Sequence, residues 1–378
     1  MADRTNYPDF NSVGPGTPTG MFLRRFWQPI YESARLKAGR CMPVRVLNED
    51  FTLYRGQSGA AFLVDARCAH RGARLSIGRV DGDNIACMYH GWTYDGSGQC
   101  VAQPPEQRSF AQSVKVRSWP VREYVGFVFA YLGEGEPPPF PRVLAAEGEG
   151  LLDARESRRP YPFFSQLENS VDEVHFNFTH RRSTFTDVGL NEEIPEIDCE
   201  ETEYGIIRLG KRSDATRVSH ILMPNCLYSK VHDELLGWTE HFSWRVPIDD
   251  ETHSSFVARK SFLVGDQVAE YQRKKDEAKA LLATLESPEA VTERILRGEL
   301  HLDELPHRPD QVMIQDLVVL KSQGSRPARE KDLLGASDKQ IRMLRQIYAR
   351  ELAAQAAGKP MKQWRIPPEL ETSTGLST

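Results

Sequence analysis

Four side chains in two short loops of this 378-residue chain could bind iron or zinc. They are Cys68, His70, Cys87 and His90, arranged as C-x-H, sixteen intervening residues and C-x2-H. A Rieske [2Fe-2S] cluster needs this mixture, because two thiolates bind one iron and two neutral imidazoles bind the other. A structural zinc site could use the same residue types, but such sites usually pair Cys with Cys and His with His. The interleaving therefore favours the cluster over zinc.

The residues around these loops fit such a site. Gly72 and Gly91 follow the two histidines and would let backbone N-H groups approach the cluster sulfides. Turn signals at residues 80–83 and 94–98 predict hairpins beside both loops. We therefore expect both ligand pairs at the tips of a small β-domain.

A second group of polar residues lies far downstream, at Asn169, Asp172, His175 and His180. In a continuous helix the first three, spaced by three, would share neighbouring parts of one face. His180 needs a local unwinding or π-bulge within residues 176–179 to reach the same point. Two His and one carboxylate form the facial triad of Fe(II) oxygenases, which leaves positions open for O2 and substrate. The alternative is a pair of structural histidines on an amphipathic helix.

The stretches from Cys68 to Gly78 and from Cys87 to Asp95 resemble those of the oxygenase component of Rieske non-haem iron oxygenases. That family usually has Pro where this chain has Met88, a position that binds no metal. The run V-G-P-G-T-P-T-G at residues 13–20, with L-R-R-F-W-Q-P at 23–29, looks like the phthalate dioxygenase branch. The resemblance extends over nearly the whole chain.

The resemblance also implies roles for single residues. Asp316, which follows Gln315, would be the third ligand of the mononuclear Fe(II), while Asn169 and Asp172 would support the site. In the family the chains form a head-to-tail homotrimer, or a multiple of one, and a carboxylate bridges the cluster of one subunit to the iron of the next. By motif position Asp172 would join His90 of one chain to His175 of its neighbour. The alternative is an Asp that only stabilises the helix.

The function that the resemblance implies is that of a terminal oxygenase in a multi-component system. It would use O2 and electrons from a flavin or iron-sulfur NAD(P)H reductase, with or without a ferredoxin, to hydroxylate a small aromatic, carboxylated substrate as a mono- or dioxygenase. O-demethylation or methyl-group hydroxylation are alternatives within the family. A Rieske electron carrier and a zinc-stabilised binding protein are rivals from other classes. The electron carrier would not need the second group of ligands, whereas the zinc-stabilised protein stays open as an alternative.

Composition argues against several classes of partner and location. The net charge of -5 gives no reason to expect nucleic acid or an anionic membrane as a partner. No apolar run of about eighteen residues and no basic-then-apolar N-terminus occurs, so we predict a soluble, cytoplasmic protein. The four further cysteines are scattered, which is typical of reduced thiols.

The predicted fold class is α+β: an all-β Rieske domain followed by a catalytic domain with an antiparallel sheet flanked by helices. We expect an N-terminal segment at residues 1–35, the Rieske domain at 36–133, a Pro/Gly-rich linker at 134–145 and the iron domain at 146–378. Predicted helices lie at about 21–27, at 267–285 and after Ser337 as N-cap, and alternating strands at 197–263. The tail after Pro367 is predicted to be disordered.

The substrate pocket is expected on the strands at about 200–260. Candidate lining residues are Ile221, Met223, Leu227, Trp238, His241 and Arg245. Arg208, Arg217 and Arg245 are candidates to pair with a substrate carboxylate, and the sequence does not choose among them.

Overall fold

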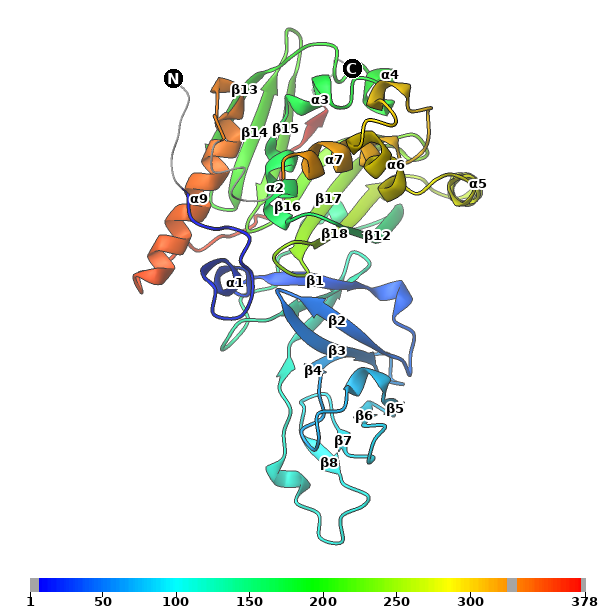
Figure 1. Cartoon of the computed structure of the whole chain (residues 1–378), viewed down its shortest axis with the longest axis vertical. Helices are drawn as coiled ribbons and strands as arrows, with labels where there is room; N and C mark the ends of the chain where they lie inside the picture. The colour runs from blue at the N-terminus through cyan, green and yellow to red at the C-terminus, as the bar shows by residue number, and fades with distance from the viewer. Residues whose placement is uncertain (1–6, 325–331, 375–378) are drawn as a thin grey trace.

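The computed structural model describes residues 7–324 and 332–374. Figure 1 shows two parts joined end to end, a slender β-rich part from the first third of the chain and a broader part in which helices cover one face of a large sheet. The predicted α+β class is confirmed.

The N-terminal part begins with α1 (Pro18–Leu23), whose start is fixed by Thr17, with Pro18 as the first helical residue. The predicted helix at 21–27 is wrong at its end, because Trp27 already pairs with Tyr131 in a sheet. Three small antiparallel sheets follow, in the orders β1-β11-β10, β2-β3-β4-β9 and β5-β6-β7-β8. Their strands are β1 (Trp27–Glu32), β2 (Cys41–Val46), β3 (Glu49–Arg55), β4 (Ala61–Asp65), β5 (Arg79–Asp81), β6 (Asn84–Ala86), β7 (Thr93–Tyr94), β8 (Cys100–Ala102), β9 (Ser118–Trp119), β10 (Val121–Tyr124) and β11 (Phe127–Tyr131).

The larger part is organised by one antiparallel sheet in the order β12-β18-β17-β16-β15-β14-β13. Its strands are β12 (Leu151–Arg159), β13 (Glu196–Glu201), β14 (Gly205–Lys211), β15 (Thr216–Leu222), β16 (Cys226–Asp233), β17 (Gly237–Pro247) and β18 (His253–Ser261). The predicted strands at 197–263 are confirmed, including the turn after Pro247. The central strands β16, β17 and β18 pair without interruption in register, so side-chain alternation along them is regular.

The two faces of this sheet have different neighbours. On one face Phe256 and Trp244 pack edge-to-face against Phe127 and Phe129 of β11, which joins the two parts of the molecule through an aromatic core. On the other face Arg245 bonds to α2, and helices cover the strands (Figure 1). The helices of the larger part are α2 (Phe163–Val171), α3 (His175–Phe178), α4 (Thr184–Asp187), α5 (Asp266–Thr284), α6 (Pro288–Leu296), α7 (Gln311–Ser322) and α9 (Lys339–Ala356).

The C-terminal segment differs from prediction in two places. Helix α9 starts after Asp338, because Ser337 belongs to a preceding 3-10 turn. The tail after Pro367 is not disordered over its described part: β19 (Ser373–Thr374) pairs with β15. Within residues 7–324 and 332–374, no helix is both long and apolar enough to cross a bilayer.

Candidate functional site

The two loops with the C-x-H and C-x2-H motifs have the same backbone geometry. Gly72 donates its N-H to the carbonyl of Cys68 at 3.0 Å, and Gly91 donates to the carbonyl of Cys87 at 2.9 Å. Both glycines have left-handed backbone angles, with φ of 73° and 72°. A side chain would strain this conformation, so each motif needs Gly four residues after its Cys.

These loops gather the four predicted cluster ligands at one end of the molecule. Cys68 and Cys87 are each 3% exposed, and the rings of His70 and His90 lie 4.7 Å apart between centroids. The Nδ1 atom of His90 is buried and has no hydrogen-bond partner among the described residues. A Rieske cluster would bind to two buried thiols and to imidazole nitrogens such as the Nδ1 of His90, which has no partner in the described part of the fold.

Tyr94 lies directly beside this site. Its hydroxyl is 3.2 Å from the Sγ of Cys68 and accepts the N-H of Ala69 at 3.2 Å. Burial raises the pKa of the Cys68 thiol. A hydrogen bond from Tyr94 to the sulfur would offset this by stabilising the thiolate that iron requires.

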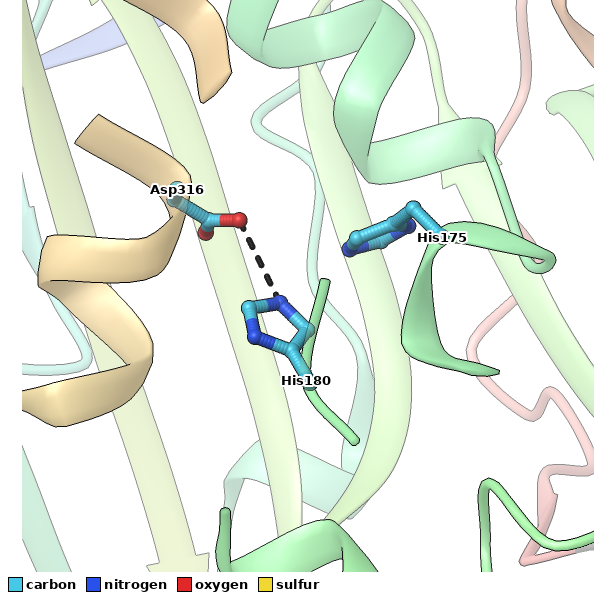
Figure 2. A group of neighbouring side chains, drawn as sticks. All are labelled: His175, His180 and Asp316. Carbon is cyan, nitrogen blue, oxygen red and sulfur yellow. Dashed lines mark ion pairs between the residues drawn. The ribbon is translucent and has the colours of Figure 1, made fainter. Parts of the chain in front are cut away.

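A second donor set lies on the helix-covered face of the large sheet. Ligand atoms of His175, His180 and Asp316 all lie within 4.8 Å of one another. Figure 2 shows the three side chains converging from separate segments, with the carboxylate of Asp316 on α7 facing the two rings. His180 Nε2 and Asp316 Oδ1 are 3.3 Å apart. This is the donor set of a facial triad.

Each imidazole in this set is oriented through its other nitrogen. The Nδ1 of His175 lies 2.6 Å from the backbone oxygen of Asp172, and the Nδ1 of His180 lies 2.8 Å from the side-chain oxygen of Gln315. Both partners are acceptors, so each Nδ1 can donate its proton and leave Nε2 for a metal, while the Nε2 of His180 also faces the Asp316 carboxylate. Neutral rings held in this tautomer are what a metal site requires.

The carboxylate of Asp316 is also oriented, because Asn169 donates its Nδ2 to Oδ1 at 3.2 Å. Burial alone would raise the pKa of Asp316, but the neighbouring His180 and His175 outweigh it and lower the pKa to about 2. Burial, together with the nearby His180, lowers the pKa of His175. Burial opposes protonation of His180 too, but the Asp316 carboxylate outweighs it and raises the pKa of that ring.

The helix predicted to carry Asn169 through His175 is wrong. α2 ends at Val171, and Asp172 is extended at ψ 114°, so the chain breaks before His175 rather than after it. No bulge is needed at 176–179, where Thr179 bonds to the carbonyl of His175 in a regular turn. The reason is local: Asp172 Oδ1 accepts the N-H groups of Val174 and His175 at 2.9 and 3.2 Å, which forms an Asx turn that starts α3.

Comparisons with known proteins show which family the chain resembles. A family model for the Rieske [2Fe-2S] domain matches residues 26–121. The oxygenase subunit of 5,5'-dehydrodivanillate O-demethylase from Sphingobium sp. is 30% identical over 383 residues, covering 97% of this chain and 84% of that protein. The α subunit of phenoxybenzoate dioxygenase from Ectopseudomonas oleovorans is 32% identical over 280 residues, covering 67% of this chain and 68% of that protein.

Similarity to the O-demethylase subunit over most of both chains decides the family. This chain belongs to the oxygenase subunits of the Rieske non-haem iron oxygenases. It is therefore an O2-dependent oxidoreductase with a Rieske [2Fe-2S] cluster and a mononuclear iron. In fold it is similar to the solved structure of the QL mutant of NdmA from Pseudomonas putida CBB5 with theobromine, with a TM-score of 0.67 at 21% identity over 89% of this chain and 92% of that chain.

The arginines proposed for a substrate carboxylate in this oxygenase fall into two groups. Arg208 and Arg217 both pair with buried Glu173, at 3.3 and 3.0 Å, so both guanidiniums are directed toward this carboxylate, which balances one of their two charges. Arg245 lies under α2 and bonds to the hydroxyls of Ser170 and Ser255. Of the three candidates, Arg245 alone has no described carboxylate within ion-pair distance.

Among the predicted lining residues, side-chain alternation separates two on β17. His241 shares the helix-covered face with Arg245, whereas Trp238 lies on the opposite face. Trp238 therefore does not share the sheet face of Arg245.

Sequence reasoning missed two supports of the oxygenase site. Gln315 was noticed only as the residue before Asp316, although its amide orients His180. Glu173 carries no local signal at all, because its three arginine partners come from β14, β15 and the turn between them. This cluster anchors the chain immediately beside the break at Asp172.

A cavity of about 300 Å³ lies elsewhere, where the N-terminal part meets the large sheet. Its lining includes Tyr31, Val44, Glu156, Val246 and Phe256, and none of the predicted ligands. It lies at the interface between the N-terminal part and the large sheet, away from His175, His180 and Asp316.

Proposed function

We propose that His175, His180 and Asp316 bind the mononuclear iron of this oxygenase, and that Cys68, His70, Cys87 and His90 bind its cluster. The observation that carries the proposal is the convergence of two oriented imidazoles and one oriented carboxylate within 4.8 Å. When bound, the iron supplies O2 activation and the cluster supplies one-electron storage.

The protein residues have distinct tasks in this proposal. Asp172 holds the His175 ring through its backbone oxygen, while its carboxylate caps the backbone beside that ring. Because that carboxylate has a second oxygen, it can also accept the imidazole N-H of His90 from another subunit. We therefore propose Asp172 as the link between neighbouring chains of a homotrimer, with Asn169 keeping Asp316 in place.

We also propose that the reaction is hydroxylation of an aromatic carboxylate. Support comes from the relatives, whose names refer to phenoxybenzoate, 3-chlorobenzoate and phthalate as substrates of dioxygenases. O-demethylation is the second candidate, because one relative that matches 97% of this chain is the oxygenase subunit of an O-demethylase.

An electron-delivering partner completes the proposed system. A solved relative is the oxygenase of carbazole 1,9a-dioxygenase in complex with its ferredoxin, at a TM-score of 0.65 and 19% identity. We propose that an NAD(P)H reductase, directly or through a ferredoxin, serves this chain in the cytoplasm.

The iron ligands are tested by metal analysis together with turnover. The purified wild type should hold about three irons per chain and the His180→Ala variant about two, with an unchanged cluster spectrum. In a reconstituted assay with a generic reductase, aromatic acids and their methyl ethers are scored by product mass. Gain of oxygen or loss of a methylene identifies the reaction, and about three irons in His180→Ala would contradict the ligand set.

Assembly is tested by mixing two inactive variants, His70→Ala and His175→Ala. In mixed trimers an intact cluster can face an intact iron site across a subunit boundary, so part of the activity should return. Proven mixing without any return of activity would contradict the intersubunit link.

A further inference from the structure

Glu173 is a buried carboxylate that belongs to neither group of metal ligands. It follows Asp172 directly in the chain and is 2% exposed. Arg217 donates from Nη1 to both of its oxygens at 3.1 and 3.0 Å, Arg208 donates at 3.3 Å, and Arg212 lies at ion-pair distance, 3.6 Å. Breaking a buried ion pair is costly, so three guanidiniums keep the Glu173 side chain in one place.

The large sheet leaves room for this carboxylate at one position. Gly210 on β14 is the cross-strand partner of Arg217 on β15. A Cβ atom at Gly210 would come within 3.1 Å of the Cγ and Oε1 atoms of Glu173. The side chain of Glu173 therefore reaches Arg217 across a residue without a side chain, which allows the close approach of the two segments.

The charges of this cluster also act on Asp172. Three guanidiniums pair with one carboxylate, so the cluster carries excess positive charge. Burial lowers the pKa of Arg208 to about 10, and the carboxylates of Glu173 and Asp172 both oppose this shift. The Asp172 carboxylate therefore lies close enough for the cluster to attract it, which favours its place in the turn that starts α3.

Arg217 also reaches the proposed iron ligands through an aromatic ring. Its guanidinium carbon lies 4.9 Å from the centre of the Phe176 ring, within the distance of a cation–π contact. The centre of the Phe176 ring lies 4.5 Å from that of His175 and 5.6 Å from that of His180. In the described part of the chain the other two arginines of the cluster make no such contact. Of the three, Arg217 is therefore the one that braces the two imidazoles through Phe176.

We propose that Arg217 and Glu173 are positioning residues for the mononuclear iron site, although neither touches the metal. The inference rests on the proposed function, which takes the two imidazoles as iron ligands. Glu173 holds the backbone next to Asp172, whose carboxylate accepts the backbone N-H of His175. Arg217 holds the Phe176 ring against both imidazoles. Together these contacts keep the two Nε2 atoms directed at one point.

The test compares two arginines of the cluster, Arg217→Gln and Arg212→Gln, in the full chain with its cluster intact. Both variants take one guanidinium from Glu173, but Arg217→Gln also loses the contact to Phe176. Fe(II) affinity, measured by chelator competition, should fall about tenfold in Arg217→Gln and less than about twofold in Arg212→Gln. With nitric oxide as a probe of the Fe(II), the electron paramagnetic resonance spectrum should change shape in Arg217→Gln and not in Arg212→Gln. Arg217→Lys keeps the charge beside Glu173 and should recover part of the affinity.

A double-mutant cycle separates positioning from fold stability. Phe176→Leu removes the ring and should lower Fe(II) affinity by a similar factor. If Arg217 acts through this ring, the double variant should lose little more affinity than either single variant. Phe176→Leu leaves the charges of the cluster unchanged, so it carries the test even if Arg217→Gln does not fold. Wild-type affinity in Phe176→Leu, or fully additive losses in the cycle, would overturn the role of Arg217.

A further readout needs no iron. In protein without the mononuclear iron, amide exchange of residues 172–180 should quicken in Arg217→Gln and stay near the wild-type rate in Arg212→Gln. Equal Fe(II) affinity in the two variants, or losses that follow Tm alike in both, would refute positioning. Iron per chain of the wild type is measured on the same samples. About three irons alongside such a result refutes positioning alone, whereas about two irons in the wild type refutes the proposed ligand set.

Discussion

Gln315 offers the sharpest test of how the iron site is oriented. It is 3% exposed, its Oε1 accepts from His180 Nδ1 at 2.8 Å, and its Nε2 donates weakly to the backbone oxygen of Arg182 at 3.4 Å. One turn earlier on α7, Gln311 donates to the same oxygen at 2.8 Å but makes no hydrogen bond to His180. Gln315→Leu and Gln311→Leu therefore form a matched pair that differs in the contact to the ring.

The expected effect follows from the buried ring. In Gln315→Leu the Nδ1-H of His180, which is 1% exposed, loses its acceptor, and the ring is free to move its proton to Nε2. Losing the partner of a buried polar group costs about 1–3 kcal/mol. Partners that orient metal-binding histidines contribute about 10–100-fold to metal affinity. Iron affinity should fall by that factor in Gln315→Leu and by less than about threefold in Gln311→Leu.

The assay is chelator competition on protein from which the mononuclear iron has been removed while the cluster is kept. Cluster absorbance verifies that the N-terminal part is intact, and Tm verifies the fold of α7. Gln315→Glu keeps an acceptor for the ring and should retain most of the affinity. Equal iron affinity in Gln315→Leu and Gln311→Leu would refute orientation through Nδ1.

Three further predictions concern other groups. Tyr94→Phe removes the hydroxyl beside the Cys68 sulfur and should lower the cluster potential by roughly 20–65 mV in a redox titration, with exposed Tyr89→Phe as the unchanged control. Burial lowers the pKa of His253 in the folded protein to about 3. Below about pH 6.5 the unfolded state therefore binds one more proton at His253 than the folded state does. The stabilising contribution of neutral His253 is complete above that pH and decreases as the pH falls. The contribution of His253 to the free energy of unfolding should be about 2 kcal/mol smaller at pH 5 than at pH 7.5, as measured by denaturant titration. If the free energy of unfolding of His253→Gln changed with pH as steeply as that of the wild type, this prediction would be contradicted. Asp172→Asn should keep both metals but lower turnover at least about tenfold by weakening the link between subunits, and wild-type turnover would count against that link.

Local patterns predicted the cluster loops because all four ligands and both glycines lie within 24 residues, Cys68 to Gly91. The strands of the large sheet were also accessible, because alternation is a short-range property. The break at Asp172 was missed although a signal existed. Asp is a common residue in Asx turns and at helix starts, and its spacing of three from Asn169 was taken for helix periodicity instead.

Pairings between distant segments could not be predicted from local patterns. Glu173 finds Arg208, Arg212 and Arg217 only because β14 and β15 fold against the segment after α2. This pairing gives two of the three arginines first proposed for a substrate, Arg208 and Arg217, a partner within the fold. Asp316 was found through family resemblance and not through spacing, since nothing in the sequence near α7 shows that it faces His180.

The origin of the three ligands on separate segments has a mechanical consequence. His180 and Gln315 are 135 positions apart, and an ion bound by His175, His180 and Asp316 would join α7 to the segment after α2 across this gap. Without that ion, α7 would be held by the hydrogen bonds of Gln311 and Gln315 and by apolar contacts such as those of Ile314 and Leu317. Amide exchange in α7 should accordingly quicken after iron removal while β17 stays protected, so that the metal tightens the fold as well as serving the reaction.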